Sequence, residues 1–169
     1  AALPDGRILI TEKSGSLRIV SPQGQISGAI TGFPALADEG QGGLLDLSLS
    51  PDYETTRLVY FTLSERAQSG SVTALGRGRL NEAAGMVENF EILYRALPYH
   101  TSAGHFGSRV VIDEDGLIYL STGDRQRDET RPNAQKPDKG HGKILRLTPD
   151  GQPAPGNPFI GRPDAIPEL

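Results

Sequence analysis

The 169-residue chain contains no cysteine and no tryptophan. Without cysteine it has no disulfide bonds, no thiolate catalysis and no cysteine-based zinc site, although either redox compartment remains open. No apolar run approaches the roughly 18 to 20 residues of a membrane-spanning helix. The formal net charge is −4, and no basic cluster with interleaved aromatic residues is present. These absences argue against nucleic acid, an anionic membrane surface or membrane insertion, and they leave small ligands open.

Glycine and proline are abundant, with 21 and 13 residues, and short β-branched runs alternate with turn signals. No segment keeps a 3.6-residue hydrophobic period over the length of a helix, so helices should be few. The pattern predicts a soluble, turn-rich, all-β protein. Strands are expected at residues 7–12, 17–20, 44–50, 57–63, 71–80, 90–97 and 143–147, with a further hairpin between residues 104 and 124.

The chain contains internal repeats. Residues 3–10 (LPDGRILI) resemble 114–120 (EDGLIYL), and residues 17–24 (LRIVSPQG) resemble 144–151 (ILRLTPDG). A repeat of roughly 45 to 60 residues with four short antiparallel strands is typical of a β-propeller blade. We therefore predict an incomplete blade at residues 1–36, a complete blade at 43–97 and a blade with a long b–c loop at 107–169.

About three blades would leave open sheet edges, because propellers close with about four to eight blades. We therefore expect the chain to be a fragment of a longer protein, truncated at both ends. Since the connections that lead into each innermost strand lie on one face of a propeller, Gln41, His105 and Asp124 should lie at the same rim of the central channel.

The hairpin between residues 104 and 124 carries His105 just before its first strand and Asp124 just after its second. A four-residue turn at residues 113–116 would place His105 directly opposite Asp124. A two-residue turn at Asp115 and Gly116 would instead place Asp124 opposite Gly107, with His105 on the same face. Either register brings the imidazole and the carboxylate within reach of each other.

A histidine side chain, with a reference pKa of about 6.5, can accept a proton at neutral pH. A carboxylate on its other ring nitrogen fixes the tautomer and stabilises the imidazolium, so His105 and Asp124 together suit a general base. The structural alternative is that His105 hydrogen-bonds a neighbouring blade while Asp124 ends its strand with an Asx turn.

Other polar residues have plainer expected roles. By alternation Arg109 lies on the His105 face, where it could bind an anionic ligand or pair with Asp113 or Asp124. His100 and His141 have no metal-type partner at a suitable spacing and should be surface or packing residues. The acidic residues of the loop at 125–142 lack the spacing of a calcium site and should be solvated. No metal site is therefore expected within this chain.

Seven segments in order resemble the soluble aldose sugar dehydrogenases of the glucose/sorbosone dehydrogenase family, which depend on pyrroloquinoline quinone (PQQ). They are GQGGLLD at 40–46, SPDY at 50–53, HFGSR at 105–109, GDR at 123–125, GKILRL at 142–147, PDG at 149–151 and NPF at 157–159. The resemblance spans nearly the whole chain. It implies a six-bladed propeller that oxidises the anomeric carbon of aldoses to lactones, passes electrons to an external acceptor, and is periplasmic or secreted.

By this resemblance His105 matches the base that takes the proton from the C1 hydroxyl, and Asp124 matches its carboxylate partner. Gln41 matches a polar contact to PQQ or substrate, and Arg109 is a further candidate for binding the cofactor. Some relatives carry an aspartate before the base, where this chain has Gly104. The family's Arg-Asn motif and calcium ligands would follow residue 169, so the chain alone should neither hold PQQ tightly nor oxidise sugar.

Two other functions remain open from the sequence. A lactonase-type propeller hydrolase would need a channel metal held by convergent Glu, Asn and Asp side chains, and missing blades could supply that cluster. A non-catalytic propeller could serve as a binding platform, in which case replacing His105 would leave its function unchanged.

Overall fold

The computed structural model describes residues 1–169 as an all-β chain, which confirms the predicted class. None of its helices is long and apolar enough to cross a membrane. The elements in order are β1 (Ile8–Glu12), β2 (Ser16–Val20), β3 (Leu44–Leu49), α1 (Tyr53–Thr56), β4 (Leu58–Ala67), β5 (Gly70–Asn81), β6 (Met86–Arg95), β7 (Gly107–Ile112), β8 (Ile118–Thr122), η1 (Arg131–Gln135) and β9 (Ile144–Leu147).

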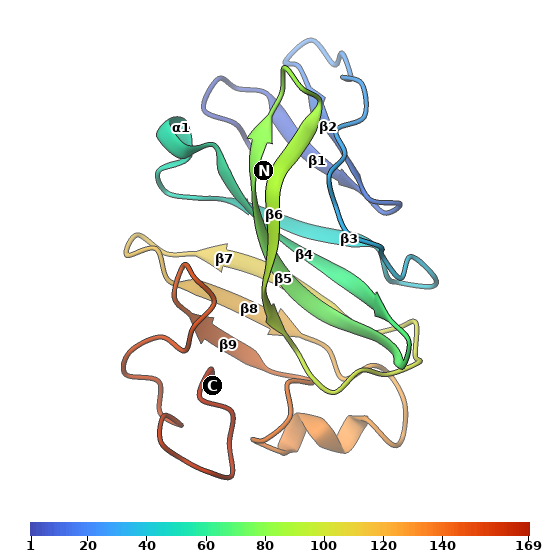
Figure 1. Cartoon of the computed structure of the whole chain (residues 1–169), viewed down its shortest axis with the longest axis vertical. Coiled ribbons are helices and arrows are strands. Elements are labelled where there is room, and N and C mark those ends of the chain that lie inside the picture. The colour runs from blue at the N-terminus through green and yellow to red at the C-terminus, as the bar shows by residue number, and fades with distance from the viewer.

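The strands form three antiparallel sheets that follow one another along the molecule (Figure 1). β1 and β2 make a two-stranded sheet, β3 to β6 a four-stranded meander, and β7 to β9 a three-stranded sheet. Strand β3 lies against both β1 and β7, so the first strand of the middle sheet links its two neighbours. The segments that lead into β3 and β7 therefore come close together, and these segments carry Gln41 and His105.

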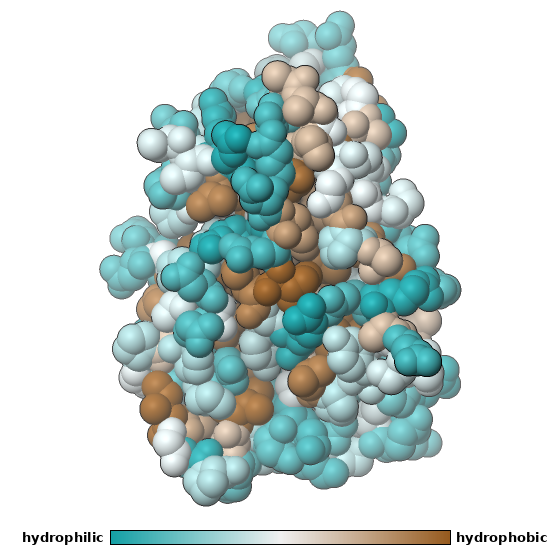
Figure 2. Space-filling model, viewed as in Figure 1, coloured by the Kyte–Doolittle hydropathy of each residue, from teal (hydrophilic) through white to brown (hydrophobic).

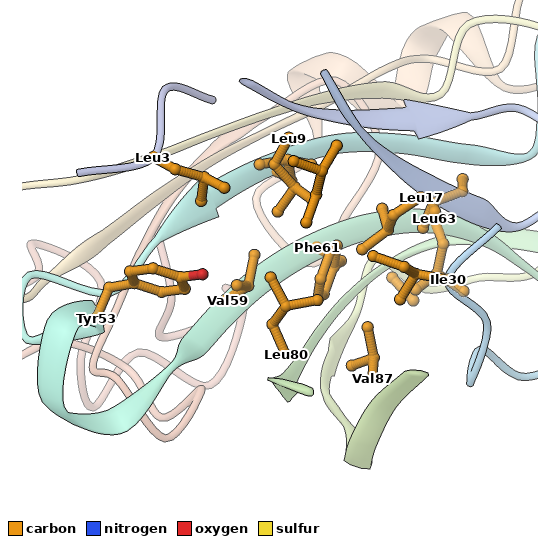
Figure 3. Close-up of a cluster of buried hydrophobic side chains, with 14 residues drawn as sticks. Leu3, Leu9, Leu17, Ile30, Tyr53, Val59, Phe61, Leu63, Leu80 and Val87 are labelled. Atoms are coloured by element: carbon orange, nitrogen blue, oxygen red, sulfur yellow. The ribbon is translucent and has the colours of Figure 1, made fainter. Parts of the chain in front are cut away.

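A separate hydrophobic core lies between each pair of neighbouring sheets. In Figure 3, Leu9 and Leu17 of the N-terminal hairpin face Val59 and Phe61 of β4, within a cluster of 14 buried residues. A second cluster joins the middle sheet to the third, where Leu75 packs with inward residues of β7, β8 and β9. Burying a large aliphatic side chain stabilises a fold by about 1.5–3 kcal/mol, so these two clusters hold the three sheets together.

The outer faces of the two terminal sheets carry exposed aliphatic and aromatic residues. Ile8 and Ile10 project outward from β1, while Val111, Tyr119 and Ile144 are exposed on the third sheet. The broad face in Figure 2 is mostly hydrophilic, with hydrophobic residues gathered toward its centre. The middle sheet contributes apolar residues to both clusters. The terminal sheets also carry apolar residues on both faces, one face in a cluster and the other exposed.

The β7–β8 hairpin has neither of the two predicted registers at its turn. Gly116 donates its N–H to the carbonyl oxygen of Asp113 at 3.0 Å, and Asp113 donates to Leu117 at 3.0 Å. Gly116 has φ +81°, so it adds one left-handed residue after the type I turn. Ile112 therefore lies opposite Ile118, which is one residue away from its partner in either predicted register.

A second irregularity between Gly107 and Val110 shifts the ladder back. Ser108 has φ +99° there, and Gly107 lies opposite Thr122. A bulge inserts an extra residue into one strand, so two such insertions on opposite strands cancel. Beyond the bulge the ladder therefore returns to the register of the four-residue turn, and His105 meets Asp124 as that turn predicted. Between the turn and the bulge the predicted pairing was wrong.

Candidate active site

The side chains of His105 and Asp124 are in direct contact. Nδ1 of His105 lies 2.8 Å from Oδ1 of Asp124. An ionised carboxylate can only accept a hydrogen bond, so Nδ1 carries the proton and Nε2 carries the lone pair. Nε2 has no hydrogen-bond partner, and the His105 side chain is 48% exposed. The arrangement therefore leaves a proton-accepting nitrogen without a partner on a half-exposed side chain.

Asp124 is held in its ionised form by two donors. Its Oδ1 also accepts the backbone N–H of Gln126 at 2.9 Å, which is an Asx turn. This backbone bond, followed by the bond to His105, lowers the pKa of Asp124 below its ordinary value. The sequence left two roles open for Asp124, as the carboxylate partner of His105 or as the residue that forms an Asx turn. In the structure Asp124 has both.

The backbone of His105 is strained and is fixed by its neighbours. His105 has φ +45°, a left-handed conformation that is costly for a residue with a side chain. Its N–H donates to Oε1 of Gln41 at 2.8 Å, and its carbonyl oxygen accepts the N–H of Arg125 at 3.2 Å. Strained backbone persists where surrounding contacts over-determine it. Gln41 thus positions His105, while its amide NH₂ remains free to donate to a ligand.

Gly123 offers a direct test of this close packing. A Cβ at this position would lie 2.5 Å from the carbonyl carbon of His105 and 2.9 Å from the nitrogen of Gly107. Both are backbone atoms that cannot move aside cheaply. We expect Gly123→Ala to destabilise the full-length protein by about 1–3 kcal/mol, measured as a lower midpoint of thermal unfolding.

Gly28→Ala is the matched control for that measurement, because a Cβ at Gly28 would meet nothing within 4 Å. Its unfolding midpoint should stay close to that of the wild type. Equal midpoints for Gly123→Ala and Gly28→Ala would contradict the packing described at His105.

Arg109 does not pair with Asp113 or Asp124, so those predicted ion pairs were wrong. Its Nη1 lies 3.2 Å from Asp46 on β3. The bulge at Ser108 interrupts the alternation on which the prediction depended. The Arg109 side chain is 74% exposed, so most of its guanidinium donors remain free for a ligand.

Asp46 is a site residue that the sequence reasoning missed. Its carboxylate accepts the N–H of Val110 at 2.9 Å, at the bulge where the β7–β8 ladder is interrupted. It therefore anchors β7 to β3 as well as pairing with Arg109. The available signal was an acidic residue inside a strand that is otherwise made of leucines and serines.

A hollow of about 600 Å³ is lined by Gln41, whose side chain bonds the His105 N–H, and by Gly107, two residues after His105. It contains two cationic side chains, Lys13 and Arg109, and the carboxylate of Asp46 already faces Arg109. Lys13 also donates to the carbonyl oxygen of Gly40 at 2.7 Å. The polar residues that line the hollow are Thr11, Lys13, Gln41, Asp46, Ser108, Arg109 and Ser121. This donor-rich lining suits a polar ligand that carries carboxylate or carbonyl oxygens.

The remaining candidate residues lie outside this arrangement. His141 is buried, its Nε2 lies 2.8 Å from the carbonyl oxygen of Pro98, and burial lowers its pKa, as expected of a packing residue. His100 lies 3.4 Å from Glu129. Asp128 and Asp138 pair with Arg131 and Lys139 on the surface. No group of three or more His, Asp or Glu side chains converges as a metal site.

Comparisons with known proteins agree on one family. The model of the family described as "Glucose / Sorbosone dehydrogenase" matches residues 1–169. An aldose sugar dehydrogenase of Escherichia coli K12 is 37% identical over 171 residues, covering 100% of this chain and 45% of that protein. A crystal structure of a glucose dehydrogenase superposes with a TM-score of 0.93 at 36% identity, covering 100% of this chain and 49% of that one.

A PQQ-bound aldose sugar dehydrogenase from Streptomyces coelicolor superposes with a TM-score of 0.81 at 30% identity. That match covers 95% of this chain and 46% of the Streptomyces chain. The chain thus spans about half the length of the relatives that it matches.

Proposed function

Because this chain belongs to the glucose/sorbosone dehydrogenase family and corresponds to the N-terminal part of its relatives, we propose that the whole protein oxidises the anomeric carbon of aldoses to lactones, with PQQ as cofactor. The observation that carries this proposal is the His105–Asp124 pair. Nε2 of His105 has no hydrogen-bond partner, and the backbone N–H of His105 is bonded to Gln41, which lines a hollow together with Lys13 and Arg109.

His105 acts as the general base in this proposal. Nε2 takes the proton of the C1 hydroxyl, the C1–H bond breaks with its electron pair, and the C1–O bond becomes the lactone carbonyl. Asp124 keeps Nε2 free of a proton before this step and stabilises the imidazolium after it. PQQ, when bound, would supply the hydride acceptor for C1, and the electrons would pass to an external acceptor.

The donors in the hollow fit part of a PQQ site. Lys13 and Arg109 provide cationic partners for carboxylates, and the free amide of Gln41 can donate to a carbonyl oxygen. No group of three or more His, Asp or Glu side chains converges among residues 1–169. By the family resemblance, the calcium ligands belong to residues outside this chain. Because only part of the proposed cofactor site lies in this chain, we expect the 169-residue chain by itself to have no aldose dehydrogenase activity.

The proposed architecture is a six-bladed propeller of which this chain supplies about three blades, at residues 1–36, 43–97 and 107–169. The exposed Ile8, Ile10, Val111, Tyr119 and Ile144 support it, since additional blades would cover these apolar faces. A periplasmic or secreted location is part of the same proposal and comes from the family.

The test is an assay of the full-length protein reconstituted with PQQ and calcium. Dye reduction should depend on both an added aldose and PQQ. Equal inactivity of the apo and reconstituted proteins on every aldose tried would overturn the proposal. Hydrolysis of lactones without dye reduction would favour the lactonase-type alternative.

A further inference from the structure

Arg125, the residue after Asp124, is a buried cation without an acidic partner. It is 1% exposed, and no carboxylate lies within ion-pair distance of its guanidinium. Arginine is rarely fully buried unless it is paired, because removing its charge from water is costly. Burial lowers the pKa of Arg125 to about 10, so the side chain stays charged at neutral pH. The lost hydration of the Arg125 guanidinium must therefore be compensated by contacts within the protein.

Those contacts are hydrogen bonds to neutral oxygen atoms of two separate chain segments. Nη1 donates to the carbonyl oxygen of Ser71 at 2.8 Å, and Nη2 donates to its hydroxyl at 2.9 Å. Nη2 also donates to the carbonyl oxygen of Ser102, and Nε donates to that of Gly104 at 3.2 Å. Ser71 lies in β5, whereas Ser102 and Gly104 lie in the segment just before His105.

Arg125 also contacts the residues on the other side of the base. Its guanidinium lies over the ring of Phe106, 4.0 Å from the centroid, in a cation–π contact. Its backbone N–H donates to the carbonyl oxygen of His105 itself at 3.2 Å. The side chain therefore touches Gly104 and Phe106, and the backbone touches His105 between them. These contacts converge on the residue whose own backbone has φ +45°.

We propose that Arg125 is a positioning residue that holds the segment around His105 so that the imidazole stays against Asp124 with Nε2 facing the substrate. The inference rests on the proposed role of His105 as base. The planar guanidinium fork reaches acceptors in several directions at once, whereas a lysine ammonium is a compact point charge. Arg125→Lys should therefore fail to restore the function.

The test uses the full-length protein with three variants: Arg125→Met, Arg125→Lys and Arg162→Met. Arg162 is the matched control, because it also lies over a phenylalanine, at 5.1 Å from the Phe159 centroid, but is exposed and pairs with Asp164. The first readout is the Nδ1–H resonance of His105 in ¹⁵N-labelled protein without cofactor, assigned by its loss in His105→Gln. The second is the division of the effect between kcat and KM in dye reduction.

We expect Arg125→Met to weaken or abolish the Nδ1–H resonance and to lower kcat by about 100-fold, with KM for the aldose changed by less than about 3-fold. Arg125→Lys should behave like Arg125→Met, and Arg162→Met like the wild type. A wild-type Nδ1–H resonance and kcat in Arg125→Met would overturn the proposal, and so would full rescue by lysine.

Two further outcomes remain decisive. If Arg125→Met does not fold, Ser71→Ala removes a single acceptor, and a shifted Nδ1–H resonance would support the proposal while an unchanged one would refute it. If the wild type oxidises no aldose, the proposed function fails. The resonance of His105 then still reports whether Arg125 positions the imidazole.

Discussion

Replacing His105 by alanine in the full-length, cofactor-loaded protein should lower kcat for aldose oxidation by about 10²- to 10⁴-fold. The physical reason is that Nε2 of His105 is the proton acceptor that the site leaves open, while Nδ1 is held by Asp124 at 2.8 Å. The fold should be kept, since the His105 side chain is 48% exposed and packs against no core. The measurement is steady-state dye reduction with saturating aldose, alongside the thermal unfolding midpoint.

His100→Asn is the matched control for the His105 variant. Nδ1 of His100 accepts the backbone N–H of Ser102 at 3.0 Å, and an asparagine side-chain oxygen can accept the same bond. Its kcat should stay within about 3-fold of the wild type. A His105→Ala protein that retains wild-type kcat would exclude His105 as the base and would favour the binding-platform alternative.

Asp124→Asn should lower kcat by about 100-fold or more while leaving the fold in place. An asparagine keeps an oxygen for the Gln126 N–H, so the Asx turn can persist. The same oxygen would face Nδ1 of His105, but as a neutral amide oxygen it lacks the negative charge that stabilises an imidazolium. Asp128→Asn, on a side chain that is 95% exposed, should leave kcat unchanged. Wild-type kcat in Asp124→Asn would contradict the proposed role of the Asp124 charge in stabilising the imidazolium.

The stability that Asp124 contributes to the folded protein should depend on pH, and Asp124→Asn can measure it. Since the pKa of Asp124 is lowered in the folded state, its stabilising contribution is present above the ordinary aspartate pKa of about 3.9 and is lost as the pH falls through the folded-state value. The stability difference between wild type and Asp124→Asn, measured by urea unfolding, should therefore be larger at pH 7 than at pH 3. A constant difference would mean that the carboxylate gains no proton-linked stability from Gln126 and His105.

The meeting of His105 and Asp124 could be predicted from the sequence because it depends on local rules. Alternation along strands, the turn signal at Asp113 to Gly116 and the position of each residue at a strand end were sufficient to bring them together. The repeat of short strands likewise predicted an all-β chain, since turn residues and β-branched runs reflect the backbone locally.

The details of the hairpin register could not be predicted in the same way. The left-handed Gly116 inserts one residue after the turn, and Ser108, a non-glycine residue at φ +99°, compensates on the other strand. Nothing in the local composition distinguishes serine at that position from an ordinary strand residue. The bulge is held by long-range bonds, from Thr62 to the carbonyl oxygen of Ser108 at 2.8 Å and from Val110 to Asp46 at 2.9 Å.

The partners of Arg109 and the burial of Arg125 were missed for a related reason. Asp46 is 63 residues from Arg109 along the chain, and Ser71 is 54 residues from Arg125. Spacing in sequence carries no information about such contacts. For Arg125, the general tendency of arginine to remain exposed pointed in the wrong direction.

The most direct test of the account is a single-turnover experiment on the full-length protein loaded with PQQ. Wild type and His105→Ala are brought to equal cofactor occupancy and mixed anaerobically with an aldose, and reduction of the cofactor is followed by its absorbance. The account predicts rapid reduction in the wild type and reduction at least about 100-fold slower in His105→Ala. Equal rates in the two proteins, or no reduction in the loaded wild type, would contradict it.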